Sequence, residues 1–167
     1  MVRLMKRKIP PNYLLEYYLK KPHLFSNIKP HKLESIMKGY VADIEELTLA
    51  NKNFRQVLYT GKHMQLVLMA IAPGDDIGEE VHEGHDQFFR IESGQGEVLI
   101  DDVSTKIKDD DVVIVPAGAK HNVLNTGDEL LQLYTIYSPP EHKDGVLRAT
   151  KAEAEASEEH FDGKTSE

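Results

Sequence analysis

The chain has 167 residues, enough for one domain with a sizeable core, and it contains no cysteine, which excludes disulfides, thiolate metal sites and a cysteine nucleophile. Its net charge of −8 is unevenly distributed, because residues 1–36 carry eight Lys and Arg against two Glu, whereas the remainder is strongly acidic. An acidic body is unsuited to binding nucleic acid, and no apolar run reaches the ~18 residues of a membrane span. We therefore expect a cytoplasmic protein that has neither nucleic acid nor a membrane as partner.

Charge and composition predict three regions. Residues 1–36 form a basic N-terminal extension that is partly helical or disordered, with one helical pattern at 12–20. Residues 37–145 form the folded body, which we expect to be stable without the extension. Residues 146–167 form an acidic C-terminal helix and tail, rich in Ala and Glu.

From residue 54 onward, the sequence is typical of short β-strands separated by turns. Runs of Val, Ile, Leu and Tyr alternate with turns that contain Gly, Pro or Asp, and the run Val112–Val115 is entirely β-branched. Strands this short at this spacing predict an all-β sandwich or barrel. The predicted strands are residues 54–59, 64–71, 79–82, 87–92, 97–100, 105–108, 112–115, 121–124 and 130–137.

Histidines and acids gather in two stretches of this β-rich region. Residues 78–96 hold His82 and His85 among several carboxylates, directly before a strand and a Gly-rich turn. Residues 116–125 add His121 at the start of another strand. Imidazole and carboxylate groups on neighbouring strands are a typical ligand set for a divalent metal, so the two stretches predict a metal pocket inside a β-barrel.

The second of these stretches resembles the second sequence motif of the cupin superfamily, G-x5-P-x-G-x2-H-x3-N. Pro116, Gly118, His121 and Asn125 stand at the motif spacing, and Asp110 replaces the leading Gly. Asp is a mild replacement at this position because it is common in tight turns.

The first stretch resembles the first cupin motif, G-x5-H-x-H-x3,4-E-x6-G, less closely. Gly94 closes the motif, Gln87 stands where the family has its Glu ligand, His82 matches the second His, and Glu80 takes the place of the first. The resemblance therefore implies a metal held by Glu80, His82, Gln87 and His121, with the single carboxylate moved to position 80. Because Gln is a weak neutral ligand, Gln87 either completes this set or binds the substrate or a metal-bound water.

The similarity covers roughly residues 53–140 and is to small single-domain cupins of the cupin 2 type, which implies a double-stranded β-helix, or jelly roll, with a metal near its open end. Alternation along a strand places Glu80 and His82 on the same side. His85 has the opposite parity and is an alternative ligand, because Gly84 gives its loop the freedom to swing inward. The predicted ligand-pocket residues are Phe89, Val123, Asn125 and Tyr134.

The resemblance implies a divalent ion such as Fe, Mn, Zn or Ni, and a metal-binding protein that binds or acts on a small polar molecule such as a sugar or an organic acid. One hypothesis is an enzyme that catalyses a dioxygenation or a sugar-phosphate type of isomerisation. The other is a non-catalytic ligand-binding or regulatory protein, which gains weight because no obvious general base is left once Glu80 binds the metal. Related cupins commonly pair through an outer sheet face, where strand parity places Phe88, so we expect a homodimer.

Overall fold

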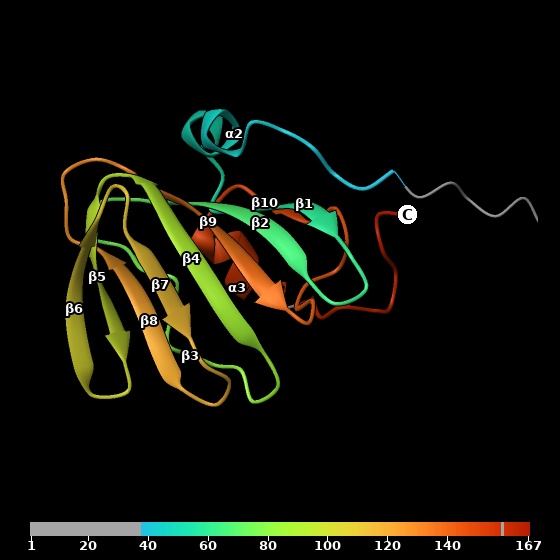
Figure 1. The fold of residues 1–167 in the computed structure, drawn as a ribbon. Coiled ribbons are helices and arrows are strands. Elements are labelled where there is room, and N and C mark those ends of the chain that lie inside the picture. Colours follow the sequence, from blue (N-terminus) through green and yellow to red (C-terminus); the bar gives the residue numbers. More distant parts are fainter. Residues whose placement is uncertain (1–37, 158) are drawn as a thin grey trace, which may run out of the picture. The chain divides into compact units, whose positions relative to one another are not determined.

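The computed structural model describes residues 38–157 and 159–167. The predicted basic extension of residues 1–36, with its helical pattern at 12–20, lies outside the described residues. In the described part, two antiparallel sheets enclose one hydrophobic core (Figure 1). The prediction of an all-β jelly roll is confirmed, and every predicted strand has an observed counterpart. No helix among the described residues is long and apolar enough to cross a membrane.

The larger sheet has six strands in the order β10–β1–β2–β9–β4–β7, and the smaller has four in the order β3–β8–β5–β6. The strands are β1 (Arg55–Thr60), β2 (Gln65–Ile71), β3 (Glu80–Val81), β4 (Asp86–Ser93), β5 (Gln95–Ile100), β6 (Val103–Lys108), β7 (Val112–Val115), β8 (Lys120–Asn125), β9 (Leu131–Ser138) and β10 (Leu147–Arg148). Residues 80 and 121 lie on β3 and β8 of the smaller sheet, and residue 87 lies on β4 of the larger sheet. Pairing between strands that are distant in sequence brings residues 80 and 121 together.

Period-two burial of side chains determines which face of each strand meets the core. Along β4, Gln87, Phe89 and Ile91 are buried, while the residues between them are partly exposed. Along β8, His121 and Val123 are buried in the same alternating manner. Burial of the apolar members drives folding, and the same alternation carries two polar side chains, Gln87 and His121, into the interior.

Helix α2 (Ile44–Ala50) was not predicted, although its start carries a sequence signal. Asp43 and Glu46 have the spacing of a capping box, and the side chain of Asp43 accepts a hydrogen bond from the backbone N of Glu46 at 3.1 Å. At the other end, the side-chain amide of Gln132 on β9 donates to the carbonyl oxygens of Thr48, at 3.2 Å, and of Leu49, at 2.9 Å. The helix is thereby attached to the larger sheet.

The C-terminal segment, which we define as residues 139–157 and 159–167, packs against the larger sheet. Strand β10 pairs with β1, and helix α3 (Lys151–Glu155) buries Ala154 in the core. The helix is shorter than the predicted Ala- and Glu-rich run, since it ends at Glu155 with Ala156 as its C-cap. Glu159 pairs with Arg148.

Gln65 fixes the start of this segment. Its side-chain Nε2 donates to the carbonyl oxygen of His142 at 2.6 Å, and its Oε1 accepts from the backbone N of His142 at 2.9 Å. The imidazole of His142 is buried against the ring of Tyr137, with 5.1 Å between ring centroids, and its Nε2 has no hydrogen-bond partner among the described residues. Burial lowers the pKa of His142 to about 3, so the ring is neutral in the folded protein.

Two turns of the jelly roll require a left-handed backbone. Gly94, between β4 and β5, has φ +91°, and a Cβ at this position would lie 2.7 Å from the carbonyl oxygen of Leu130. Asp110, which replaces the leading Gly of the second motif, has φ 72°. Its backbone carbonyl and its carboxylate both accept hydrogen bonds from Arg90, which offsets the strain of a non-Gly residue there.

Gly94→Ala is expected to destabilise the protein by about 2–5 kcal/mol, because backbone strain and overlap with a carbonyl oxygen add together. Gly145→Ala is the matched control, since Gly145 has φ +68° but open space around it, and it should cost only the strain of about 1–2 kcal/mol. Urea unfolding of both variants measures the difference. Equal losses of stability in the two variants would show that the close approach at Gly94 is unimportant.

Replacing His142 should alter how stability depends on pH. The pKa of His142 is about 3 when folded, against 6.5 when unfolded, so the unfolded chain binds a proton between these values that the folded chain does not. Stability is therefore lost as the pH falls from 6.5 toward 3, by about 1.4 kcal/mol per pH unit at most. His142→Leu should reduce the loss between pH 7 and pH 4.5, measured by urea unfolding, whereas exposed His63→Asn should not. An unchanged loss in His142→Leu would contradict the assignment.

Candidate functional site

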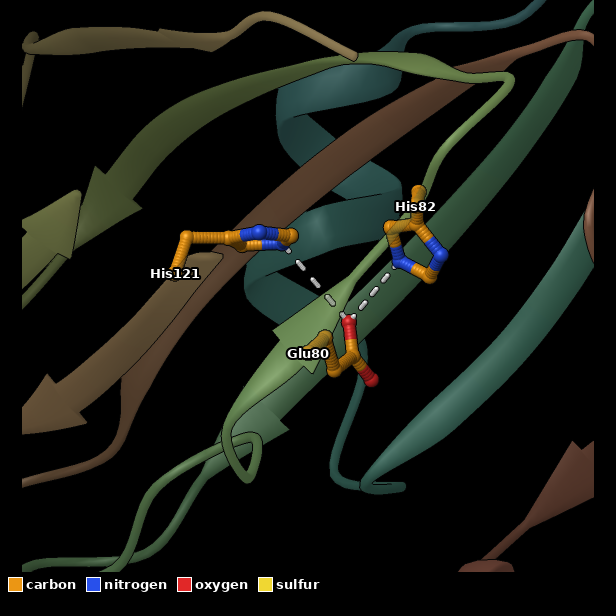
Figure 2. A group of neighbouring side chains, drawn as sticks. All are labelled: Glu80, His82 and His121. Carbon is orange, nitrogen blue, oxygen red and sulfur yellow. Dashed lines mark hydrogen bonds and ion pairs between the residues drawn. The ribbon is translucent and has the colours of Figure 1, made fainter. Parts of the chain in front are cut away.

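The site is built from β3, β8 and β4. Glu80 on β3 is paired in register with His121 on β8, so the two side chains start from directly opposite positions of the smaller sheet. His82 lies two residues after Glu80 and projects to the same side. Figure 2 shows Glu80 between the two imidazoles, with its carboxylate directed at both. The Glu80 Oε2 atom lies 3.2 Å from His82 Nε2 and 3.8 Å from His121 Nε2.

Gln87 joins this group from the larger sheet. It is buried on β4, its Nε2 donates to Thr135 Oγ1 at 3.1 Å, and in this orientation its Oε1 lies 2.9 Å from His121 Nε2. His121 Nε2 therefore faces two oxygen atoms, one from Gln87 and one from Glu80. The structure thus brings together the four residues implied as ligands by the sequence motifs.

The surroundings of His121 favour a cation beside its Nε2. The other ring nitrogen, Nδ1, lies 3.1 Å from the carbonyl oxygen of Ala119, which can only accept a hydrogen bond. A neutral imidazole has one N–H, so while Gln87 keeps this amide orientation one ring nitrogen turns a lone pair toward an oxygen. Burial lowers the pKa of His121, which disfavours the imidazolium that would satisfy both contacts. A metal ion held at Nε2 would remove the repulsion, with Nδ1–H donating to the carbonyl oxygen of Ala119.

The spacing of the donor atoms fits a divalent ion. Two ligands with metal bonds of about 2.1 Å lie roughly 3.0–3.4 Å apart at right or tetrahedral angles. The closest donor atoms of Glu80, His82 and His121 all lie within 4.8 Å of one another, so small side-chain movements suffice to close the set. Two imidazoles and one carboxylate suit Fe(II), Zn or Ni better than Mg or Ca.

Charges around the site hold Glu80 and His82 in place. The hydrogen bond from the imidazole to Glu80 raises the pKa of His82. The Arg55 guanidinium approaches the second oxygen of Glu80, with 3.9 Å between Nη2 and Oε1. The Arg55 side chain is only 13% exposed, and its Nε is buried without a hydrogen-bond partner among the described residues. A buried, incompletely paired guanidinium is well suited to hold an anion.

His85 and Glu141 form a neighbouring contact that includes a residue the sequence did not indicate. His85 lies in the loop between β3 and β4, and its Nε2 is 3.2 Å from Glu141 Oε2. Glu141 belongs to the C-terminal segment and also approaches His82, with 3.9 Å between Oε2 and Nδ1. No motif spacing marks Glu141; the only signal was its place directly after the Pro pair that ends β9.

A cleft of about 410 Å³ opens beside these residues. Its walls come from the start of β1, from β3 with its flanking residues, and from the C-terminal segment. Arg55, Glu80, His82 and Glu141 all reach the wall, whereas Gln87 and His121 are buried and do not line it. A small molecule in this cleft would meet the proposed ligands through Glu80 and His82.

None of the four predicted pocket residues lines this cleft. Phe89 packs beside the His121 ring, with 6.2 Å between centroids, and Val123 lies in the hydrophobic core. Asn125 shapes the turn after β8, where its Nδ2 donates to the carbonyl oxygens of Ile71 and Glu129 at 2.8 and 2.7 Å. The pairing of Tyr134 with Arg90 places its ring on the outer face, beside Phe88.

Tyr137 is the tyrosine of β9 that faces inward. It is fully buried, and its ring lies 5.7 Å from that of His82 between centroids. Burial raises its pKa far above the ordinary value, so the phenol stays protonated. Tyr134, which was predicted to line the pocket, has the opposite parity on this strand and faces outward.

Comparisons with known proteins agree with this architecture. Residues 67–137 match the family model for the cupin domain. The chain is 44% identical over 128 residues to the uncharacterized protein YrkC of Bacillus subtilis, covering 73% of this chain and 69% of that protein. It is 26% identical over 111 residues to an oxalate-binding protein of Thermotoga maritima, covering 66% and 88%.

A solved structure has a similar fold. The crystal structure of BH2720 from Bacillus halodurans superposes with a TM-score of 0.71 at 43% identity, covering 72% of this chain and 96% of that one. The sheet order, the two motifs, the matching family model and these relatives together establish that the chain belongs to the cupin family.

Proposed function

We propose that this cupin binds one divalent transition-metal ion through Glu80, His82 and His121, and uses it to bind a small organic acid in the adjoining cleft. The observation that carries the proposal is the position of His121 Nε2, which faces the oxygen atoms of Gln87 and Glu80 while Ala119 occupies the other ring nitrogen. Fe, Mn, Zn and Ni all suit the donor set. Gln87 serves as a weak fourth ligand or as a contact to a metal-bound molecule.

The metal would supply a Lewis acid that attracts the oxygen atoms of the ligand. The chain's own residues have separate tasks. Nδ1–H of His121 donates to Ala119, which holds the imidazole in one orientation. Arg55, whose Nε has no hydrogen-bond partner within residues 38–157 and 159–167, lies in the wall beside Glu80 and provides positive charge for a second carboxylate oxygen.

The choice of an organic acid rests on charge and on one relative. The cleft wall is rich in Glu, so without a metal it would repel an anion. A dication beside Glu80, together with the guanidinium of Arg55, would make the inner end of the cleft attractive to an anion. The relative from Thermotoga maritima is an oxalate-binding protein. We therefore place small mono- and dicarboxylic acids ahead of neutral sugars as ligands.

An enzyme acting on the same class of acid is the second candidate, and Glu141 favours it. This carboxylate lies in the cleft wall and is not one of the metal ligands Glu80, His82 and His121. It is therefore available to move a proton to or from a bound molecule. Incubation of the metal-loaded protein with oxalate and similar acids separates the two functions. Stoichiometric binding without product supports a binding protein, and oxygen uptake or product formation supports an enzyme.

Metal affinity tests the ligand set. His82→Ala and His121→Ala should abolish retained metal at this position, and Glu80→Ala should weaken it by at least the ~10–100-fold that is typical when outer-shell partners are lost. His85→Ala should change the affinity of this position by only a few-fold. Gln87→Glu should tighten binding, because a second negative charge then faces the cation. Calorimetric titration of each variant with one divalent metal is the measurement.

A different ranking would refute this ligand set. If His85→Ala abolished all metal binding while Glu80→Ala retained it, the first motif would be aligned in the wrong register. The ion would then lie among His82, His85 and His121.

The outer face of the larger sheet is the expected dimer contact. Phe88 on β4 lies opposite Ile114 on β7 and Ile136 on β9, which makes an apolar strip across three strands. The side chain of Ile114 is 65% exposed on an edge strand. We propose that a second copy of the chain covers this strip.

Sedimentation at micromolar concentration should show a species of twice 18.9 kDa. Ile114→Glu should shift it to the monomer, because a charge cannot be buried in an apolar contact without a partner. Val103→Glu is the control, since Val103 is equally exposed but lies on the smaller sheet, and it should leave the dimer intact. A wild-type chain that sediments only as a monomer would contradict the proposal.

A further inference from the structure

His82 lies between two carboxylates rather than beside one. Its Nε2 is 3.2 Å from Glu80 Oε2, and its Nδ1 is 3.9 Å from Glu141 Oε2. On the far side of Glu141, His85 Nε2 lies 3.2 Å from the same Oε2 atom. Acids and imidazoles therefore alternate from the buried His121 outward to His85, and the proposed metal position uses only the inner half of this series.

We propose that His82, His85 and Glu141 form a second divalent-cation position at the outer end of the series. The closest donor atoms of these residues lie within 4.8 Å of one another, as do those of the inner position. The side chains are 15–20% exposed, so the cluster is sheltered yet reachable from solvent. Two imidazoles and a carboxylate suit Zn, Ni or Fe(II), as they do at the inner position.

Contacts around Glu141 and His85 already orient them for this role. His160 Nδ1 lies 3.2 Å from Oε1 of Glu141, which leaves Oε2 directed at His82 and His85. The carbonyl oxygen of Glu141 accepts from the backbone N of Phe161 at 2.7 Å. The carbonyl oxygen of Pro140 lies 3.3 Å from His85 Nε2 and adds an oxygen donor beside the cluster. Such supporting contacts around ligands are typical of protein metal sites.

The C-terminal segment supplies the carboxylate of this second position. Glu141 directly precedes His142, whose backbone N and carbonyl oxygen both bond to the side chain of Gln65. The anchoring of His142 therefore fixes the distance of Glu141 from the barrel. The outer position depends on the proposed function only because the two positions share His82. This residue offers Nε2 to the inner ion and Nδ1 to the outer one. With both ions bound, the ring would release its remaining N–H proton to solvent, which two dications favour.

Zinc stoichiometry of the full chain tests the proposal. By calorimetry, with metal analysis after desalting, the wild-type chain should bind two equivalents of Zn²⁺. Glu141→Gln and His85→Gln should each bind one, with the affinity of the retained equivalent within a few-fold of the wild-type value. His82→Ala should weaken both steps. Glu155→Gln, which removes the same charge from another residue of the cleft wall, should still bind two.

The variants also separate this proposal from the metal position proposed above. Glu80→Gln and His121→Ala remove ligands of the inner position only, so each variant should still bind one equivalent of Zn²⁺. Adding Glu141→Gln to either variant should abolish that remaining equivalent. If Glu80→Gln and His121→Ala each bind two equivalents of Zn²⁺, the ligand set proposed for the inner position is refuted, while the proposal for the outer position stands. One equivalent in the wild-type chain that Glu141→Gln retains, or two equivalents in Glu141→Gln, would overturn the outer position. Thermal unfolding of each chelator-treated variant confirms that the variant is folded.

Discussion

The antiparallel register between β3 and β8 is the constraint on which the site depends. It sets Glu80 opposite His121, and a slip of one residue would turn Glu80 and His82 to the other face of the sheet. Strand β3 has only two residues, so its own ladder cannot fix this register. Neighbouring contacts do so, because the backbone N of Ile77 bonds to the carbonyl oxygen of Val123, and that of Gly118 bonds to the carbonyl oxygen of His82.

A second constraint is the burial of polar side chains at inward strand positions. Gln87, Thr135 and His121 are almost completely buried in an otherwise apolar interior, where an unpaired polar group costs free energy. The hydrogen bond between Gln87 and Thr135 satisfies part of this demand. Nε2 of His121 still faces the oxygen atoms of Gln87 and Glu80, a contact that a bound cation would relieve.

The C-terminal segment turns a barrel mouth into an asymmetric cleft. Gln65 holds His142 by its main chain, β10 extends the larger sheet, and α3 places Ala154 in the core. These contacts carry Glu141 to the side of His82 that faces away from Glu80. A residue after the last barrel strand thus becomes part of the site, and two carboxylates with different surroundings contact one imidazole. The fold leaves Arg55 as the positive group next to them.

The sequence predicted the strands, the two motifs and the shared face of Glu80 and His82, because all of these follow from local periodicity and spacing. It did not reveal α2, although the Asp43 and Glu46 capping pair was available as a signal. The sequence also did not show that Tyr137 faces inward and Tyr134 outward, since parity separates the two residues but the packing of the sheets fixes which face meets the core. The place of Glu141 beside His82 was also unpredictable, because a contact between residues 59 positions apart depends on how the chain returns to the barrel, which no local pattern encodes.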